Sequence, residues 1–205
     1  MSPTTHQGLT SGFAAHGVRV VSIDYRLAPE DPFPAQLTDA ISAYKHLILN
    51  DGVSEEKIFF GGDSAGGGLA LSAAIWIRDH GGDEDLPMPA GLVLISPYVD
   101  VTHSSPTSVL PGEFEYDTLP VMEQGVPELV PKNKTELRTH PLLSPLADGK
   151  EGLPPQFWAM ATADRLVGEN LAMVVKRVEG AGESAVVDIY EEQGEFAVLS
   201  AKWLS

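Results

Sequence analysis

One stretch of ten residues, Phe59-Phe60-Gly61-Gly62-Asp63-Ser64-Ala65-Gly66-Gly67-Gly68, constrains the fold more than any other part of the chain. An apolar run breaks there into glycines around one serine and then continues as a helix, and its centre has the form Gly-x-Ser-x-Gly. This pattern makes a tight strand-to-helix turn in which the serine is strained and flanking glycines avoid steric clashes. We therefore expect Ser64 to be a nucleophile and the Ala65 N–H to donate to an oxyanion at the start of the helix.

Two other interpretations of this stretch stay open. A serine before an apolar helix is a common N-cap, so Ser64 also fits a glycine-rich turn with a purely structural role. Glycine-rich turns that enter helices also bind phosphate. Phosphate binding is the weaker alternative, because the stretch lacks the Lys-Ser/Thr ending of a P-loop and the spacing of a dinucleotide loop.

The composition excludes several classes of protein. The chain has 205 residues, which suits a single domain spanning 1–205, and its 43% hydrophobic and 20% charged residues argue against general disorder. The net charge of -16, from 29 acidic and 13 basic residues, disfavours nucleic acid and anionic membranes as partners.

Cysteine is absent, so disulfides and thiolate metal sites are excluded. No basic-then-apolar leader opens the chain, and no run of about 18 apolar residues occurs. We expect no cofactor, no metal, no membrane span and a cytoplasmic location.

Segments that predict strands alternate with segments that predict helices, which favours an α/β fold with a mainly parallel sheet flanked by helices. The expected strands are Val18–Ile23, Ile58–Phe60, Gly91–Ile95, Phe157–Ala161 and Ala185–Tyr190. The expected helices are Thr4–His16, Ala35–Leu49, Ser64–Arg78 and Val167–Glu179. Residues 98–140 hold five of the sixteen prolines and predict a cap-like excursion with short helices.

Several motifs together resemble the hormone-sensitive-lipase branch of the α/β-hydrolases, a family of serine carboxylesterases. They follow the family's order from about Val18 to Phe196. These motifs are Tyr25-Arg26-Leu27-Ala28-Pro29-Glu30, Phe33-Pro34-Ala35, Gly62-Asp63-Ser64-Ala65-Gly66-Gly67, Ser96-Pro97-Tyr98-Val99-Asp100, Ser144-Pro145-Leu146 and Gly152-Leu153-Pro154-Pro155.

The resemblance implies that Ser64 is the nucleophile and that Asp164, just after a strand, is the triad acid. An acid at the start of a helix also interacts favourably with the helix dipole, so a structural role for Asp164 stays open. Asp100 also follows a strand and is a weaker rival. We expect Arg26 and Glu30 to hold their turn by ion pairing.

Two parts of the family's catalytic machinery are missing. Gly194 stands where the family's general-base histidine belongs, and no histidine follows His140. The His-Gly-Gly-Gly oxyanion motif is absent as well, and with it the first strands. We therefore expect an N- and C-terminally incomplete member of the family with feeble activity, since losing a triad histidine costs about 10⁶ in kcat in a well-studied serine protease.

The remaining histidines are poor substitutes by position. His80 lies about 24 Å from Ser64 along the helix at about 1.5 Å per residue, and the three early histidines, His6, His16 and His46, lie in or beside helices. His103 and His140 bracket the cap-like excursion and are weak candidates for a surrogate base.

Three functions follow from this pattern. The first is a carboxylesterase in which Ser64 attacks small apolar esters. The second is a non-catalytic binder of a small apolar ligand, since the family includes the plant gibberellin receptor, which lacks the histidine. The third is a fragment without function that does not fold.

Overall fold

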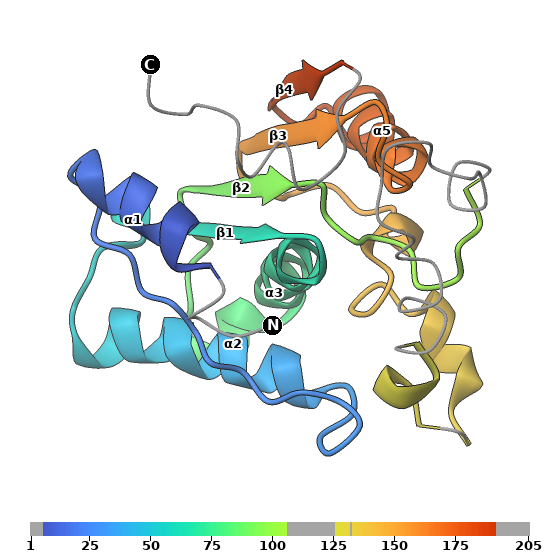
Figure 1. Cartoon of the computed structure of the whole chain (residues 1–205). Coiled ribbons are helices and arrows are strands. Elements are labelled where there is room, and N and C mark those ends of the chain that lie inside the picture. The colour runs from blue at the N-terminus through green and yellow to red at the C-terminus, as the bar shows by residue number, and fades with distance from the viewer. Residues whose placement is uncertain (1–5, 106–125, 132, 192–205) are drawn as a thin grey trace.

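The computed structural model describes residues 6–105, 126–131 and 133–191 (Figure 1). Its centre is a sheet of four parallel strands in the order β1-β2-β3-β4. The strands are β1 (Phe59–Asp63), β2 (Gly91–Ile95), β3 (Gln156–Ala161) and β4 (Ala185–Tyr190). The predicted α/β fold with a parallel sheet is thereby confirmed.

Helices precede the sheet and connect its strands. The α-helices are α1 (Gln7–Ala15), α2 (Ala35–Lys45), α3 (Ala65–His80) and α5 (Val167–Val175). Shorter helical turns are η1 (His46–Asn50), η2 (Glu55–Lys57), η3 (Gly81–Glu84), η5 (Thr135–Thr139), η6 (Pro145–Ala147) and η7 (Lys176–Gly180). Four of the expected strands and all four expected helices are therefore present, with shifted ends. The expected second and fourth helices are each longer than α2 and α5, and the short turns η1 and η7 cover the remaining residues.

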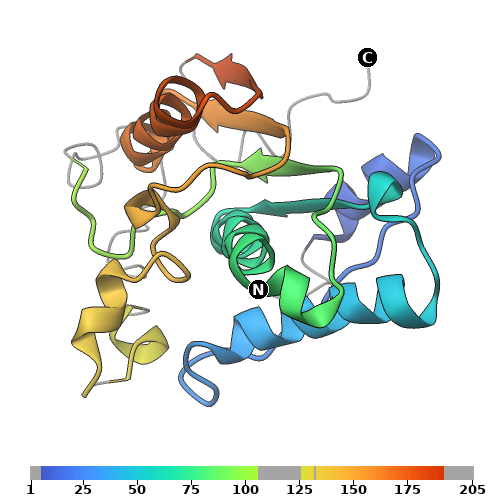
Figure 2. The same cartoon turned by 180° about the vertical axis from the view of Figure 1, so that it is seen from behind.

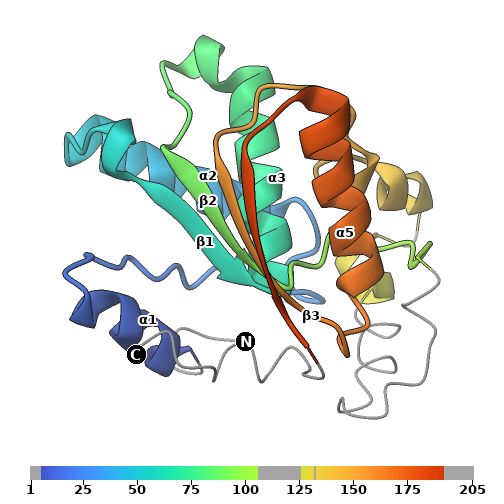
Figure 3. The ribbon, with the colours of Figure 1, turned by 90° about the horizontal axis from the view of Figure 1, so that it is seen from above.

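The helices form layers on both faces of the sheet (Figure 3). Helices α3 and α5 cover one face, where Leu71, Leu94, Trp158 and Met160 are buried in the main core. Helix α1 lies on the other face and contributes Leu9 to a smaller cluster. Helix α2 packs against α3, as the reverse view shows (Figure 2).

All four strands point the same way, so their carboxyl ends lie along one edge (Figure 1). The register aligns Asp63 with Ile95, and Ile95 with Ala159. Residues that follow β1, β2 and β3 are therefore brought together, because parallel strands end at a common edge where α/β folds build their binding sites.

Residues 18–23 do not form the buried strand that their β-branched pattern predicts. They are extended but unpaired, and the side chains of Val18 and Val21 are 52% and 48% exposed. A strand needs a partner for its backbone groups, and within the described part of the chain none lies beside this segment.

The turn after this segment is held by Arg26. Its guanidinium makes a bidentate contact with Asp39 on α2, at 2.7 Å for the shortest bond, and lies 3.6 Å from Asp31. The expected ion pairing of Arg26 is confirmed, but both partners are aspartates; none of the ion pairs among the described residues involves Glu30.

The expected cap-like excursion lies largely outside the described residues. Its described parts include a buried apolar cluster of Val101, Val126 and Val130, which Leu143 completes from the following segment. The cap and the single-domain organisation stay predictions. Among the helices that the structure describes, none has the length and apolar character needed to cross a bilayer.

Candidate active site

Ser64 occupies a strained bend between β1 and α3. Its φ of 50° and ψ of -119° lie outside the regions that side chains other than glycine favour. The Ser64 N–H donates to the carbonyl of Ile95 at 3.0 Å, and the Ser64 carbonyl accepts the N–H groups of Gly68 and Tyr98 at 3.1 and 2.8 Å. Backbone bonds on both sides therefore hold the serine, which is half-buried, in its unusual conformation.

Packing of the bend requires only the first of the two glycines of the motif. A Cβ atom on Gly62 would lie 2.4 Å from the carbonyl carbon of Gly66, so the first glycine is needed. A Cβ atom on Gly66 itself meets no atom within 4 Å, so the expectation of a clash there is wrong. The close approaches occur one turn into the helix, where Gly67 faces Pro97 and Gly68 faces the Tyr98 carbonyl.

Ala65, the proposed oxyanion donor, is the first residue of α3. The first amides of an α-helix have no partner within the helix and lie at the positive end of its dipole. The Ala65 N–H therefore belongs to a group of backbone donors beside Ser64. Its role as an oxyanion donor stays a prediction.

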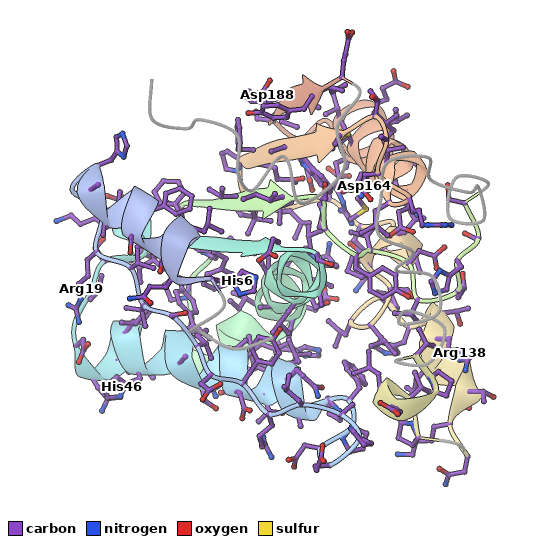
Figure 4. The ribbon with its side chains drawn as sticks, viewed as in Figure 1. His6, Arg19, His46, Arg138, Asp164 and Asp188 are labelled. Carbon is purple, nitrogen blue, oxygen red and sulfur yellow. The ribbon has the colours of Figure 1, made fainter. Side chains whose placement is uncertain are left out.

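Asp164 follows β3 and lies at the same edge of the sheet as Ser64 (Figure 4). β1 and β3 are separated by one strand, which corresponds to about 10 Å. The carboxyl group is buried, and Oδ1 accepts the Leu166 N–H at 2.8 Å. Burial raises the pKa of Asp164, while the Ser96 hydroxyl and the Leu166 N–H oppose the shift.

The Ser96 hydroxyl is near enough to lower the pKa of Asp164, but among the described residues neither this hydroxyl nor the second oxygen of Asp164 has a partner in hydrogen-bond geometry. A buried, unpaired carboxylate oxygen is unfavourable, and a triad acid leaves one oxygen for the histidine that it orients. The structural role is supported as well, because Oδ1 accepts the N–H of Leu166, the residue immediately before α5. The structure thus supports both interpretations of Asp164.

Asp100, the rival acid, is occupied by its own loop. Its two carboxylate oxygens accept the N–H and hydroxyl groups of Thr102 and Ser104, at distances from 2.5 to 2.9 Å. Burial raises its pKa, but these four hydrogen bonds outweigh burial and the net pKa is lowered. Asp100 therefore stabilises the loop as an anion and has little capacity left to orient a base.

The later histidines have partners in their own parts of the chain, and one of them, His80, is also far from Ser64. His80 lies at the opposite end of α3, where its ring packs near Trp76. His103 Nε2 lies 2.8 Å from the Tyr98 hydroxyl, and His140 Nδ1 accepts the Leu142 N–H at 3.2 Å. Each of these imidazoles has a local partner, which supports the structural interpretation over a surrogate base. Gly194 lies outside the described residues.

His6 makes a contact beside Ser64 that its place in the sequence does not indicate. Its Nε2 lies 3.0 Å from Oδ2 of Asp63, the residue immediately before Ser64, and Figure 4 shows it beside β1 and the start of α3. A separation of 57 positions in the chain leaves no local pattern from which this contact could be found. His16 and His46 lie near Gly12 and Asp51, as expected for histidines of early helices.

A second acidic residue, Glu169 on α5, was also missed. It is fully buried, and burial raises its pKa to about 8. Helical spacing alone gives no sign of this, because a glutamate in the first turn of a helix is ordinarily solvated. Among the described residues, no group of three or more histidine, cysteine or acidic side chains is arranged to hold a metal ion.

Comparison with known proteins identifies the class. A family model described as the alpha/beta hydrolase fold matches residues 1–197. The chain therefore belongs to the α/β-hydrolase family. Its relatives place it in the branch of esterases that resemble hormone-sensitive lipase.

Three relatives illustrate the placement. An acetyl-hydrolase of Streptomyces hygroscopicus is 38% identical over 75% of this chain and 50% of its own length. An esterase of Acinetobacter venetianus is 28% identical over 98% of this chain and 62% of its own length. The crystal structure of a hormone-sensitive lipase from a metagenome library has a TM-score of 0.86 at 32% identity, over 100% of this chain and 68% of that one. The chain thus spans about half to three fifths of the length of these curated relatives.

Proposed function

We propose that this chain carries the nucleophile half of a serine carboxylesterase site, with Ser64 as nucleophile and Asp164 as triad acid. The observation that carries the proposal is the backbone of Ser64, which is strained at φ 50° and held by three hydrogen bonds at the carboxyl edge of the sheet. Strained residues of this kind cluster at functional sites. The membership of this chain in an esterase and lipase family supports the same proposal.

In the proposed reaction, Ser64 Oγ attacks the carbonyl carbon of a small apolar ester. The C–O bond to the alcohol breaks, an acyl-serine forms, and water later releases the acid and restores the serine. The Oγ proton passes to a base and then to the departing alkoxide. Because Gly194 replaces the histidine of the family, we propose that this proton goes to water and that turnover is slow.

A second candidate function is that of a small-molecule binder that has lost the base. The observation in its favour is the same glycine at position 194. The cytoplasmic location expected from the sequence stays a prediction under either function.

Hydrolysis of short p-nitrophenyl esters distinguishes the two. We expect slow hydrolysis by the native chain, less by Ser64→Ala, and a gain of about tenfold or more in Gly194→His that disappears in Gly194→His combined with Ser64→Ala. A Gly194→His variant that folds but stays at the Ser64→Ala rate argues against a damaged esterase. Binding of apolar acids by the native chain then supports the binder.

A further inference from the structure

Two adjacent side chains of α5, Glu169 and Asn170, contact the loop that follows β2. Both are fully buried. Oε1 of Glu169 accepts a hydrogen bond from the Val99 N–H at 3.0 Å, and Nδ2 of Asn170 donates to the Pro97 carbonyl at 3.1 Å. The first turns of α5 therefore bind the loop on both sides of Tyr98.

Tyr98 is also the residue of this loop that contacts the serine bend. Its N–H donates to the Ser64 carbonyl at 2.8 Å. A Cβ atom on Gly68 would lie 2.1 Å from the Tyr98 carbonyl oxygen, and one on Gly67 would lie 2.7 Å from Cβ of Pro97. The loop and the start of α3 are therefore packed so closely that a shift of one displaces the other.

We propose that Glu169 and Asn170 are positioning residues for Ser64. They fix the loop after β2, and the loop fixes the Ser64 carbonyl and the first turn of α3. Both act through Tyr98 and its neighbours. The effect on reactivity rests on the proposed role of Ser64 as nucleophile, whereas the contacts are testable without any reaction.

The ionisation of Glu169 gives the arrangement a pH dependence. Burial raises the pKa of Glu169 to about 8 and the negative charges of Asp100 and Asp164 add to the shift, while the backbone N–H groups of Val99 and Asp100 oppose it. Tyr98 is a further ionisable group beside Glu169. Its own pKa is raised by burial and by the charges of Glu169 and Asp100, which the charge of Arg138 opposes. When Glu169 ionises, near pH 8, it therefore places another negative charge near the proposed triad acid, Asp164. The Val99 N–H then donates to a carboxylate instead of a neutral carboxyl group.

Amide NMR spectra of the whole chain between pH 5 and 10 test the contacts. Glu169→Gln keeps an acceptor that does not ionise, and Glu169→Leu keeps the volume without an acceptor. In the native chain we expect the Val99 and Tyr98 amide shifts to change together with a midpoint near pH 8. The glutamine variant removes this step and keeps slow hydrogen exchange, whereas the leucine variant speeds exchange at both amides by about tenfold.

Two results overturn the proposal. One is the absence of a common step at the two amides of the native chain. The other is a folded Glu169→Leu variant in which Tyr98 exchanges at the native rate. If the leucine variant does not fold, the comparison of the native chain with Glu169→Gln decides alone.

The rate at which a fluorophosphonate labels Ser64 tests the consequence for reactivity. We expect about tenfold slower labelling in Glu169→Leu, rescue in Glu169→Gln, and a step in the native rate at the pH where the amides titrate. Equal rates in all three chains contradict a positioning role. A native chain that is not labelled at all contradicts the proposed function instead, and the amide spectra still decide the inference.

Discussion

The backbone at Ser64 is more informative than its side chain. Positive φ at a residue other than glycine is unfavourable by about 1 to 3 kcal/mol, so it persists only where neighbouring groups hold it. The carbonyl of Ser64 accepts two of the three backbone bonds that do so. The sequence predicted the strain correctly, because a serine between glycines at a strand-to-helix junction has few other conformations.

The two glycines of the motif have different requirements, and paired substitutions separate them. We expect Gly62→Ala to destabilise the fold by about 3 kcal/mol, because the new methyl group overlaps the Gly66 backbone at 2.4 Å. Gly66→Ala is the matched control, and its effect is neutral or stabilising by up to about 1 kcal/mol, since the site is open and alanine favours helix. Urea denaturation of both variants measures the difference. Equal destabilisation contradicts the geometry.

Glu169 predicts a pH dependence of stability. Its pKa in the folded chain, about 8, lies above its ordinary value of 4.5, so the folded chain binds the proton more tightly than the unfolded chain. The stability that this proton contributes is complete below pH 4.5 and is lost as the pH rises through 8. Relative to Glu169→Gln, we expect the native chain to lose on the order of 4 kcal/mol between pH 4.5 and 9. Urea denaturation across this pH range measures the loss. A difference in the free energy of unfolding between the two chains that does not change with pH contradicts the raised pKa of Glu169.

Among the elements, the strands and their parallel arrangement were the most predictable part. The apolar runs that end at Asp63, Ile95 and Ala161 became strands, because a parallel sheet buries both faces and needs no alternation. Val18–Ile23 has a similar composition but does not form a strand, because strand formation requires a neighbouring strand, which composition does not reveal. The contacts of His6 and Glu169 could not be predicted for the same reason, since each joins segments far apart in the chain.

An ion cluster fixes the helices at the end of the molecule opposite to Ser64. The buried Asp148 carboxylate contacts Arg78 at the end of α3 and Arg177 in η7, at 2.7 and 2.6 Å. Burial raises the pKa of Asp148, but the two guanidinium groups outweigh burial and lower it overall. This cluster therefore stabilises the chain above the ordinary carboxyl pKa, and that contribution is lost as the pH falls through the lowered value.

Removal of this carboxylate leaves the buried Arg177 and the partly buried Arg78 without their shared partner. We expect Asp148→Asn to lower the free energy of unfolding by about 3 kcal/mol at pH 7. Asp79→Asn is the control, because Asp79 also pairs with Arg78 but is more exposed, and it should lose less than about 1 kcal/mol. Chemical denaturation of the two variants measures this, and similar small losses contradict the importance of the buried cluster.

On the scale of the whole molecule, the four-stranded sheet and its helices form the part that is packed, while residues 18–23 add little to it. The main core lies between the sheet and helices α3 and α5. The extended segment exposes most of its apolar side chains, which is unusual for valine and isoleucine in a folded protein. The net charge of -16 does not explain this packing. A net charge affects which partners a protein attracts more than it affects the fold.

The distribution of stability follows from this contrast. We expect Val21→Thr to change the free energy of unfolding by less than about 0.5 kcal/mol, because this side chain is half exposed and packs little. Leu94→Ala, in the middle of β2, should lose about 3 kcal/mol, because its side chain is fully buried. Thermal unfolding followed by circular dichroism checks both variants. A native chain without a cooperative transition contradicts the packed sheet altogether.

The proposed nucleophile is tested most directly by covalent labelling of the whole chain with a fluorophosphonate, followed by mass spectrometry of the peptide that contains residue 64. The reagent reacts with serines whose hydroxyl is held in an open, activated position. We expect a single phosphonyl group on Ser64 of the native chain and no label in Ser64→Ala. The proposed replacement of the family's histidine by Gly194 predicts that the label forms slowly. An unlabelled native chain, or equal labelling of the alanine variant, would contradict the assignment of Ser64.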